Sequence, residues 1–270
     1  MSLRIQNNVE AFNAQRQLVH NSDKLSKAME KLSSGYRINR AGDDAAGLAI
    51  SEKLRGQIGG LTQASRNAQD AVSLVQTAEG ALNEVHSMLQ RVRELAVQYK
   101  NGTLSTQDRT AIQSEVDQLK AEIERIGSET EFNGIKLLNS ATTTVSFQVG
   151  ASDGQQITAA TISVGAQVAS TVYALSSVAS QTDIQQIDDA INNISAARAV
   201  YGAVQNRVEH TIANLASYTE NLTASESRIR DADMASEMVQ FTKLQILQQA
   251  GTSMLAQANQ APQGVLSLLR

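Results

Sequence analysis

The chain has 270 residues, a formal net charge of −4 and no cysteine, and aromatic residues make up only 3% of it. The acidic balance argues against a nucleic-acid surface, and the lack of cysteine excludes disulfides and thiol chemistry. No N-terminal apolar run predicts a secretory signal, and no stretch predicts membrane insertion. Low aromatic content with abundant alanine, glutamine, leucine and serine favours long helices over a compact mixed fold.

The first predicted helix covers residues 4–34 and ends at Gly35, a residue type that favours the left-handed conformation at a helix end. Its apolar residues recur at helical spacing and are expected to form one stripe, made of Ile5, Val9, Phe12, Val19, Leu25, Met29 and Leu32. A polar connector leads to a helix over about 44–57, which Gly59 and Gly60 are expected to interrupt or kink.

The stretch 61–99 carries the strongest coiled-coil signal. Apolar residues recur at two heptad positions over more than four repeats: Ala68, Val75, Leu82, Leu89 and Ala96, with Ala71, Ala78, Val85, Val92 and Tyr99. Asn101 and Gly102 predict a turn, after which Ser105 or Thr106 caps another helix. That helix is expected to pack antiparallel on the first through a second seam, made of Ile112, Val116, Leu119, Ile123 and Ile126.

Gly127 is expected to end this helix, and the composition then changes. Threonine, valine, isoleucine and glycine dominate residues 130–165, with a tendency to alternate. This pattern predicts a β-hairpin over about 145–164 with its turn at Ser152–Gly154. Residues 166–182 have no clear periodicity and are expected to be loop or weak strand.

Helical periodicity returns over residues 184–222, and Thr223 with Glu226 has the capping-box spacing of a fresh helical start. The closing helix is expected to run to about Asn259, with Pro262 ending regular structure. The predicted fold is therefore mainly α. It has long antiparallel coiled-coil helices, a small β-hairpin region, and paired N- and C-terminal helices.

The two chain ends differ in charge. The first forty residues hold seven bases against three acids, and the last forty hold two bases against three acids. Between Lys243 and Arg270 there is no charged residue, and glutamine, asparagine, serine and alanine occupy the polar face. A solvated helix would carry charges there, so this face is expected to be buried against other protein. The two ends are predicted to pair for assembly.

The predicted domains follow from this pairing. Residues 1–44 and 229–270 form the expected inner assembly domain, and residues 45–228 form an outer helical rod with a β-rich insertion at about 130–182. The residues expected to carry assembly are apolar positions of the terminal helices: Ile5, Val9, Phe12, Met238, Phe241, Leu244, Leu247 and Leu255.

No catalytic, cofactor-binding or metal site is predicted. His20, His86 and His210 have no partners at metal-ligand spacing. Asp43 and Asp44 fit a helix cap better than a pair of catalytic carboxylates, and the glycines around them lack the lysine of a phosphate loop. The sequence therefore does not predict an enzyme.

Five segments resemble bacterial flagellin: Lys31–Ile58, Leu89–Gln98, Thr130–Leu138, Ala203–His210 and Leu255–Arg270. The resemblance covers about residues 1–138 and 184–270. It departs from the family at Gln6, where asparagine is usual, and in a short central region, 139–183. It implies a structural subunit that polymerises into the flagellar filament for motility and is exported unfolded, without cleavage, through the flagellar secretion channel. It therefore implies an extracellular location.

The resemblance also implies partners. These are further copies of the chain, an export chaperone on the C-terminal segment, a capping complex at the filament tip, and an animal Toll-like receptor. In the family the receptor reads the helix with the QRVREL motif and the helix after it, which carries over to Arg91, Leu95 and Glu115. No cofactor is implied.

Two other functions remain open from sequence. A hook–filament junction protein has the same architecture, although such proteins usually match the family motifs less completely. An intracellular coiled-coil scaffold would explain the heptads, but it would explain neither the predicted hairpin nor the uncharged end.

Overall fold

The structure is a computed structural model that describes residues 8–139, 144–168 and 182–268. Helices dominate the described residues, as predicted, and the strands form two small antiparallel hairpins. The chain divides into two compact units, one made of Met1–Gly56 with Asn221–Arg270 and the other of Gln57–Glu220. These boundaries lie within long helices, whereas the sequence analysis placed them near the helix ends.

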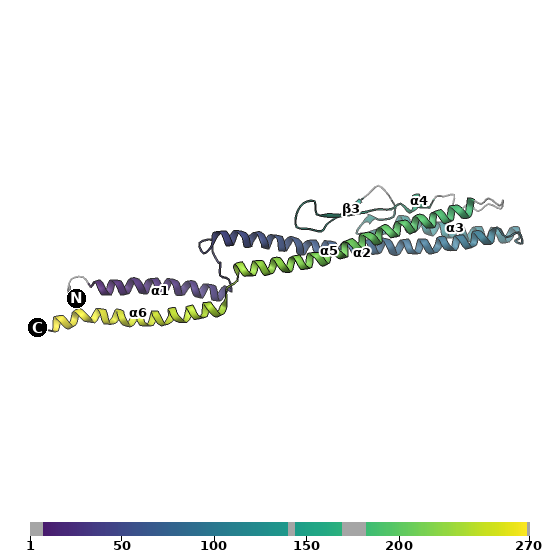
Figure 1. Cartoon of the computed structure of the whole chain (residues 1–270). Coiled ribbons are helices and arrows are strands. Elements are labelled where there is room, and N and C mark those ends of the chain that lie inside the picture. The colour runs from purple at the N-terminus through teal and green to yellow at the C-terminus, as the bar shows by residue number, and fades with distance from the viewer. Residues whose placement is uncertain (1–7, 140–143, 169–181, 269–270) are drawn as a thin grey trace. The chain divides into compact units, whose positions relative to one another are not determined.

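The first unit is built on the N- and C-terminal helices, α1 (Val9–Ser34) and α6 (Met234–Leu268), which lie side by side (Figure 1). They run antiparallel, because the Asn8 side chain donates to the carbonyl of Ala258 at one end and Ala232 N–H donates to the carbonyl of Gly35 at the other. The predicted pairing of the terminal helices is therefore confirmed.

The ends of α1 have clear local causes. Asn8 caps the helix, since its side chain accepts a hydrogen bond from Ala11 N–H. The helix thus begins at Val9 rather than at residue 4, and residues 4–7 lie outside the described part of the chain. Gly35 ends it in the left-handed conformation at φ 75°, as predicted.

The predicted helical start at Thr223 is wrong. The helix α5 (Thr182–Arg230) is continuous, and the break falls at residues 231–233. There Asp233 caps α6 by accepting hydrogen bonds from Ala235 and Ser236 N–H at 3.0 and 3.3 Å. The predicted stop near Pro262 is also wrong, because α6 continues to Leu268. Proline fixes φ near its helical value and removes only one backbone donor, so a helix can pass through it at a cost.

The second unit packs α3 (Thr106–Glu129) and the long helices α2 (Ala45–Tyr99) and α5 around one core. The expected interruption at Gly59 and Gly60 is wrong, since α2 is continuous. Glycine costs a helix only about 1 kcal/mol relative to alanine, which packing can offset. At Gly60 an added Cβ would lie 3.0 Å from the Cβ of Ala151, so the small residue admits a close neighbour there.

The predicted heptad seams form this core. All the predicted seam residues of α2 except Tyr99 are fully buried, and Ile112, Val116 and Ile123 of α3 are buried with them. From α5 the core receives Ile187, Ile194, Tyr201 and Val208. The turn at Asn101–Gly102 is confirmed, and Ser105 and Asp108 form a capping box at the start of α3.

The predicted hairpin is present, as β3 (Thr144–Gln148) paired antiparallel with β4 (Gln156–Ala160). The sequence analysis missed a smaller hairpin of β1 (Glu131–Phe132) and β2 (Ile135–Lys136). Its two-residue turn has positive φ at both positions, which Asn-Gly favours. That Asn-Gly pair was the sequence signal for it.

Two further corrections concern the same region. Gly127 does not end α3, which runs to Glu129. It lies inside the helix, where an added Cβ would be 3.3 Å from the Cβ of Val164. A short helix, α4 (Val164–Gln167), begins the stretch expected to be loop. Most of that stretch, residues 169–181, lies outside the described residues.

Candidate assembly and recognition surfaces

The contact between α1 and α6 is a narrow seam. Its residues alternate at spacings of three and four on both helices, as in a coiled coil. They are Ala11, Ala14, Leu18, Asn21, Leu25, Ala28 and Leu32 on α1, and Glu237, Phe241, Leu244, Gln248, Gly251, Leu255 and Ala258 on α6. Small residues allow a close approach, since a Cβ added at Gly251 would lie 3.0 Å from the Leu18 side chain. Even so, Ala28 is the one buried residue of α1.

Large apolar side chains lie exposed on both helices outside this seam. Their exposed fractions range from 40% at Leu247 to 71% at Val239. On α1 they are Val9, Phe12, Val19 and Met29, and on α6 they are Met234, Met238, Val239, Ile246, Leu247 and Met254. Isolated exposed apolar residues are ordinary, but a set this large on one helix pair is typical of an interaction surface.

The single stripe predicted for α1 is therefore wrong. Of the described residues of that stripe, only Leu25 and Leu32 face α6, and Val9, Phe12, Val19 and Met29 point elsewhere. The seam follows positions spaced by three and four, at which alanines alternate with leucines on α1. Val9, Phe12, Val19 and Met29 do not occupy those positions.

The residues predicted to carry assembly fall into two groups. Phe241, Leu244 and Leu255 lie half-buried in the seam. Four others are exposed outside it, namely Val9, Phe12, Met238 and Leu247. Ile5 lies outside the described residues. The terminal helices thus have one apolar face for each other and further apolar surface that no described residue covers.

Arg230 stabilises the break between α5 and α6 in the same unit, a role that the sequence analysis missed. Its guanidinium donates to the Glu52 carboxylate at 2.6 Å and lies 4.8 Å from the centre of the Tyr36 ring. Its carbonyl accepts from Arg37 N–H at 2.7 Å, beside a bridge between Tyr36 and Asp231. The hydrogen bond from Arg230 lowers the pKa of Glu52. These contacts fix the chain where α5 gives way to α6.

In the second unit the structure brings together Arg91 and Glu115, two of the three residues expected at a receptor site. Arg91 Nε donates to Glu115 Oε1 at 2.9 Å, and Arg91 also pairs with Glu94 at 3.2 Å. The hydrogen bond to Glu115, followed by that to Glu94, raises the pKa of Arg91. Both members of the pair are about half exposed, at 51% and 45%. Leu95 does not join them on the surface, because it is only 2% exposed in the core.

Nothing in residues 8–139, 144–168 and 182–268 brings together three histidine or carboxylate side chains that could hold a metal ion. Among those residues no helix is long and apolar enough to span a membrane. The extended seams and exposed apolar faces are typical of a mainly helical structural protein.

Comparison with known proteins gives the family. Residues 5–143 match the bacterial flagellin N-terminal helical region, and residues 184–269 match the corresponding C-terminal helical region. A flagellin of Halalkalibacterium halodurans is 56% identical, covering 98% of this chain and 99% of its own length. A flagellin of Bacillus subtilis is 51% identical, covering 99% of this chain and all of its own length. The chain belongs to the bacterial flagellin family and is a structural subunit of the flagellar filament, outside the cell.

Solved structures agree with this assignment. The crystal structure of Bacillus cereus flagellin is 34% identical with a TM-score of 0.52, and it covers 60% of this chain and 94% of its own. A hook-associated protein of Vibrio parahaemolyticus has a TM-score of 0.61 but only 15% identity, over 70% of this chain and all of its own, so it shows the fold alone. The comparisons give no support to the hook–filament junction alternative.

Proposed function

We propose that α1 and α6 form the domain through which copies of this chain assemble into the filament. The observation that carries this proposal is the set of large apolar side chains left exposed on both helices after they pair. Fully burying one such side chain contributes about 1.5–3 kcal/mol. Neighbouring copies in a polymer would supply that burial for every subunit.

Substitution of two exposed apolar residues in the full chain tests this proposal. Phe12 is 61% exposed and Val239 is 71% exposed, and neither belongs to the seam between α1 and α6. The double variant Phe12→Ser with Val239→Ser is expected to raise the protein concentration needed for filament growth at least about tenfold, because each lost burial weakens every copy-to-copy contact.

The matched control changes exposed polar neighbours, as Gln15→Ser with Gln240→Ser. Sedimentation of filaments at a series of protein concentrations gives the measurement. The proposal fails if the apolar double variant and the glutamine double variant need the same concentration as the unaltered chain.

The family resemblance further supports export of the unfolded chain, with a chaperone on the C-terminal segment and a capping complex at the filament tip. A chaperone on α6 would cover the exposed Met238, Ile246 and Met254 before assembly. Addition of a flagellar chaperone to the purified monomer is therefore expected to slow methionine oxidation on α6. Unchanged oxidation in a mixture that forms a complex would place the chaperone elsewhere.

We also propose that the exposed ion pair of Arg91 and Glu115 is read by an animal Toll-like receptor, with buried Leu95 supporting the helix beneath it. The chain offers a matched control in Arg93, which lies on the same helix and pairs with Asp188 instead. Arg91→Ala is expected to lower signalling by soluble monomer at least about tenfold, as loss of a buried interface arginine does. Arg93→Ala is expected to leave it unchanged. Equal potency of the two variants would contradict the proposal.

A further inference from the structure

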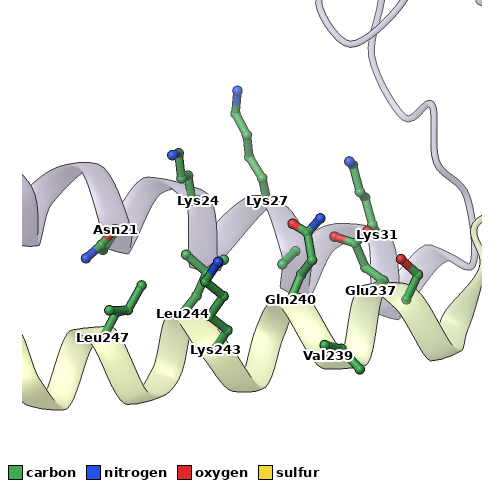
Figure 2. A pocket seen from close by; sticks show the side chains of 12 residues that line it. Asn21, Lys24, Lys27, Lys31, Glu237, Val239, Gln240, Lys243, Leu244 and Leu247 are labelled. Carbon is green, nitrogen blue, oxygen red and sulfur yellow. The ribbon is translucent and has the colours of Figure 1, made fainter.

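A groove of about 800 Å³ lies along the contact between α1 and α6 (Figure 2). It is lined by four lysines, Lys24, Lys27, Lys31 and Lys243, but by only one acid, Glu237. Figure 2 shows Lys24, Lys27 and Lys31 extending from α1, with Leu244 and Leu247 on the α6 side. The groove therefore combines an excess of positive charge with an apolar floor.

The four lysines form no close ion pair within the described residues. Asp43 lies near two of them: its pKa is lowered by hydrogen bonds from the backbone of Arg40 and Asn39 and, to a lesser extent, by the charges of Lys31 and Lys27. Among the described residues, none of their ammonium groups has a carboxylate within ion-pair distance, although many other bases of the chain are paired. Lysines spaced along one helix repel one another, and an added negative charge would relieve that repulsion. An occupant of this groove should be acidic and carry apolar side chains.

We infer that the groove receives the start of α6 from a second copy of this chain. This acidic segment consists of Asp231, Asp233, Met234 and Met238, and no base occurs between residues 231 and 242. Both aspartates are exposed, and the methionines, one helical turn apart, are 47% and 50% exposed. Asp233 caps its helix by accepting hydrogen bonds from the backbone N–H groups of Ala235 and Ser236.

The two surfaces match in chemistry. The aspartates would face lysines, and the flexible methionine side chains would pack on the leucines of the groove floor. The lysines of the groove and the aspartates of the acidic segment are different residues, so the charge contact is head-to-tail rather than self-complementary. Head-to-tail contacts propagate into open helical polymers, which is the form that a filament subunit needs. The inference rests on the proposed assembly role of α1 and α6, and it adds the charges that set the register of neighbouring copies.

Two charge-reversed full-length variants test the contact. In the first, Lys24→Glu with Lys27→Glu reverses the groove. In the second, Asp231→Lys with Asp233→Asn reverses the acidic segment, and asparagine keeps the helix cap. Each variant alone brings like charges together at every contact. Each is expected to elongate filament seeds at least about tenfold more slowly than the unaltered chain, measured by electron microscopy of filament length.

An equimolar mixture of the two variants is expected to elongate to within about threefold of the unaltered rate. In the mixture, the acidic groove of the first variant can bind the basic segment of the second. The basic groove of the second variant can in turn bind the acidic segment of the first. Such rescue by mixing can arise only from a contact between copies. The charge-conserving variant Lys24→Arg with Lys27→Arg is the control and should elongate normally.

A mixture no faster than either variant alone would overturn the inference, as would normal elongation by each variant alone. Either result leaves the assembly role of the terminal helices intact. A different result would contradict the proposed assembly role of α1 and α6, namely filament formation by chains that lack either helix.

Discussion

The terminal helix pair and the core of the second unit use the same heptad-like spacing but reach very different burial. On α2, seam residues such as Val75, Leu82 and Leu89 are fully buried, because α3 and α5 both contribute to the core around them. On α1, Ala28 alone is buried, because α6 is its main packing partner among the described helices. The comparison teaches that periodicity shows where a helix makes contact, whereas the number of partners decides how much of it is covered.

This difference in burial affects which helices can fold in the free monomer. Ordering a residue costs roughly 1–2 kcal/mol in backbone entropy, and one two-helix seam whose side chains stay mostly half-buried recovers little of that. We therefore expect the second unit to fold in the free monomer. The terminal helices are expected to become ordered only on assembly.

The largest expected effect is the complete loss of filament formation. Removing residues 1–40 or 231–270 is expected to abolish filaments, because each deletion removes one partner of the terminal pair. The part of the chain from 45 to 228 is expected to stay helical and soluble. Electron microscopy and circular dichroism measure the two outcomes. Filament formation by either truncated chain would show that the terminal helix pair is not needed for assembly.

Hydrogen exchange on the free monomer tests the difference directly. Amides of Leu244–Ala258 in α6 are expected to exchange at least about a thousandfold faster than those of Val75–Leu89 in α2, whose opening requires global unfolding. In assembled filaments the α6 amides should become protected as well. Strong protection of Leu244–Ala258 before assembly would show that the terminal pair is already folded and that the coupling is absent.

Truncation of one leucine in each seam sharpens the comparison. Leu89→Ala removes a fully buried side chain and is expected to lower the free energy of unfolding of the monomer by about 2–5 kcal/mol. Leu244→Ala is expected to leave monomer unfolding unchanged and to raise the concentration needed for assembly. Denaturant titration followed by filament sedimentation distinguishes them. A clear loss of monomer stability in Leu244→Ala is the contrary result.

The smallest expected effect comes from the helix caps. Ser105 caps α3 in the second unit, and Asn8 caps α1. Ser105→Ala is expected to lower the free energy of unfolding of the monomer by about 1 kcal/mol. Asn8→Ala should not change it, because α1 is not expected to be ordered there. Chemical unfolding of the two variants side by side provides the check, and equal losses would argue that both helices are folded.

Local and periodic features of the chain could be predicted from sequence alone. The α2 seam from Ala68 to Ala96 was predicted because a heptad repeat sustained over many turns has few alternatives. Gly35 and the Asn101–Gly102 turn were predicted because they depend on backbone preferences of the residues themselves. The candidate assembly helices were found in the same way, since a long uncharged run is a property of composition.

Tertiary structure decided where those local preferences yield to packing. Gly60 and Gly127 lie inside helices at points where an added Cβ would be only 3.0 and 3.3 Å from the Cβ atoms of Ala151 and Val164, a closeness that no local pattern shows. Likewise the bulky residues of α1 are predicted to face α6, but Val9, Phe12, Val19 and Met29 lie outside the seam, where Gly251 of α6 makes room for Leu18. The burial of Leu95 had the same origin, in the helices that cover it. A local preference is worth about 1 kcal/mol, and contacts between residues distant in sequence outweigh it.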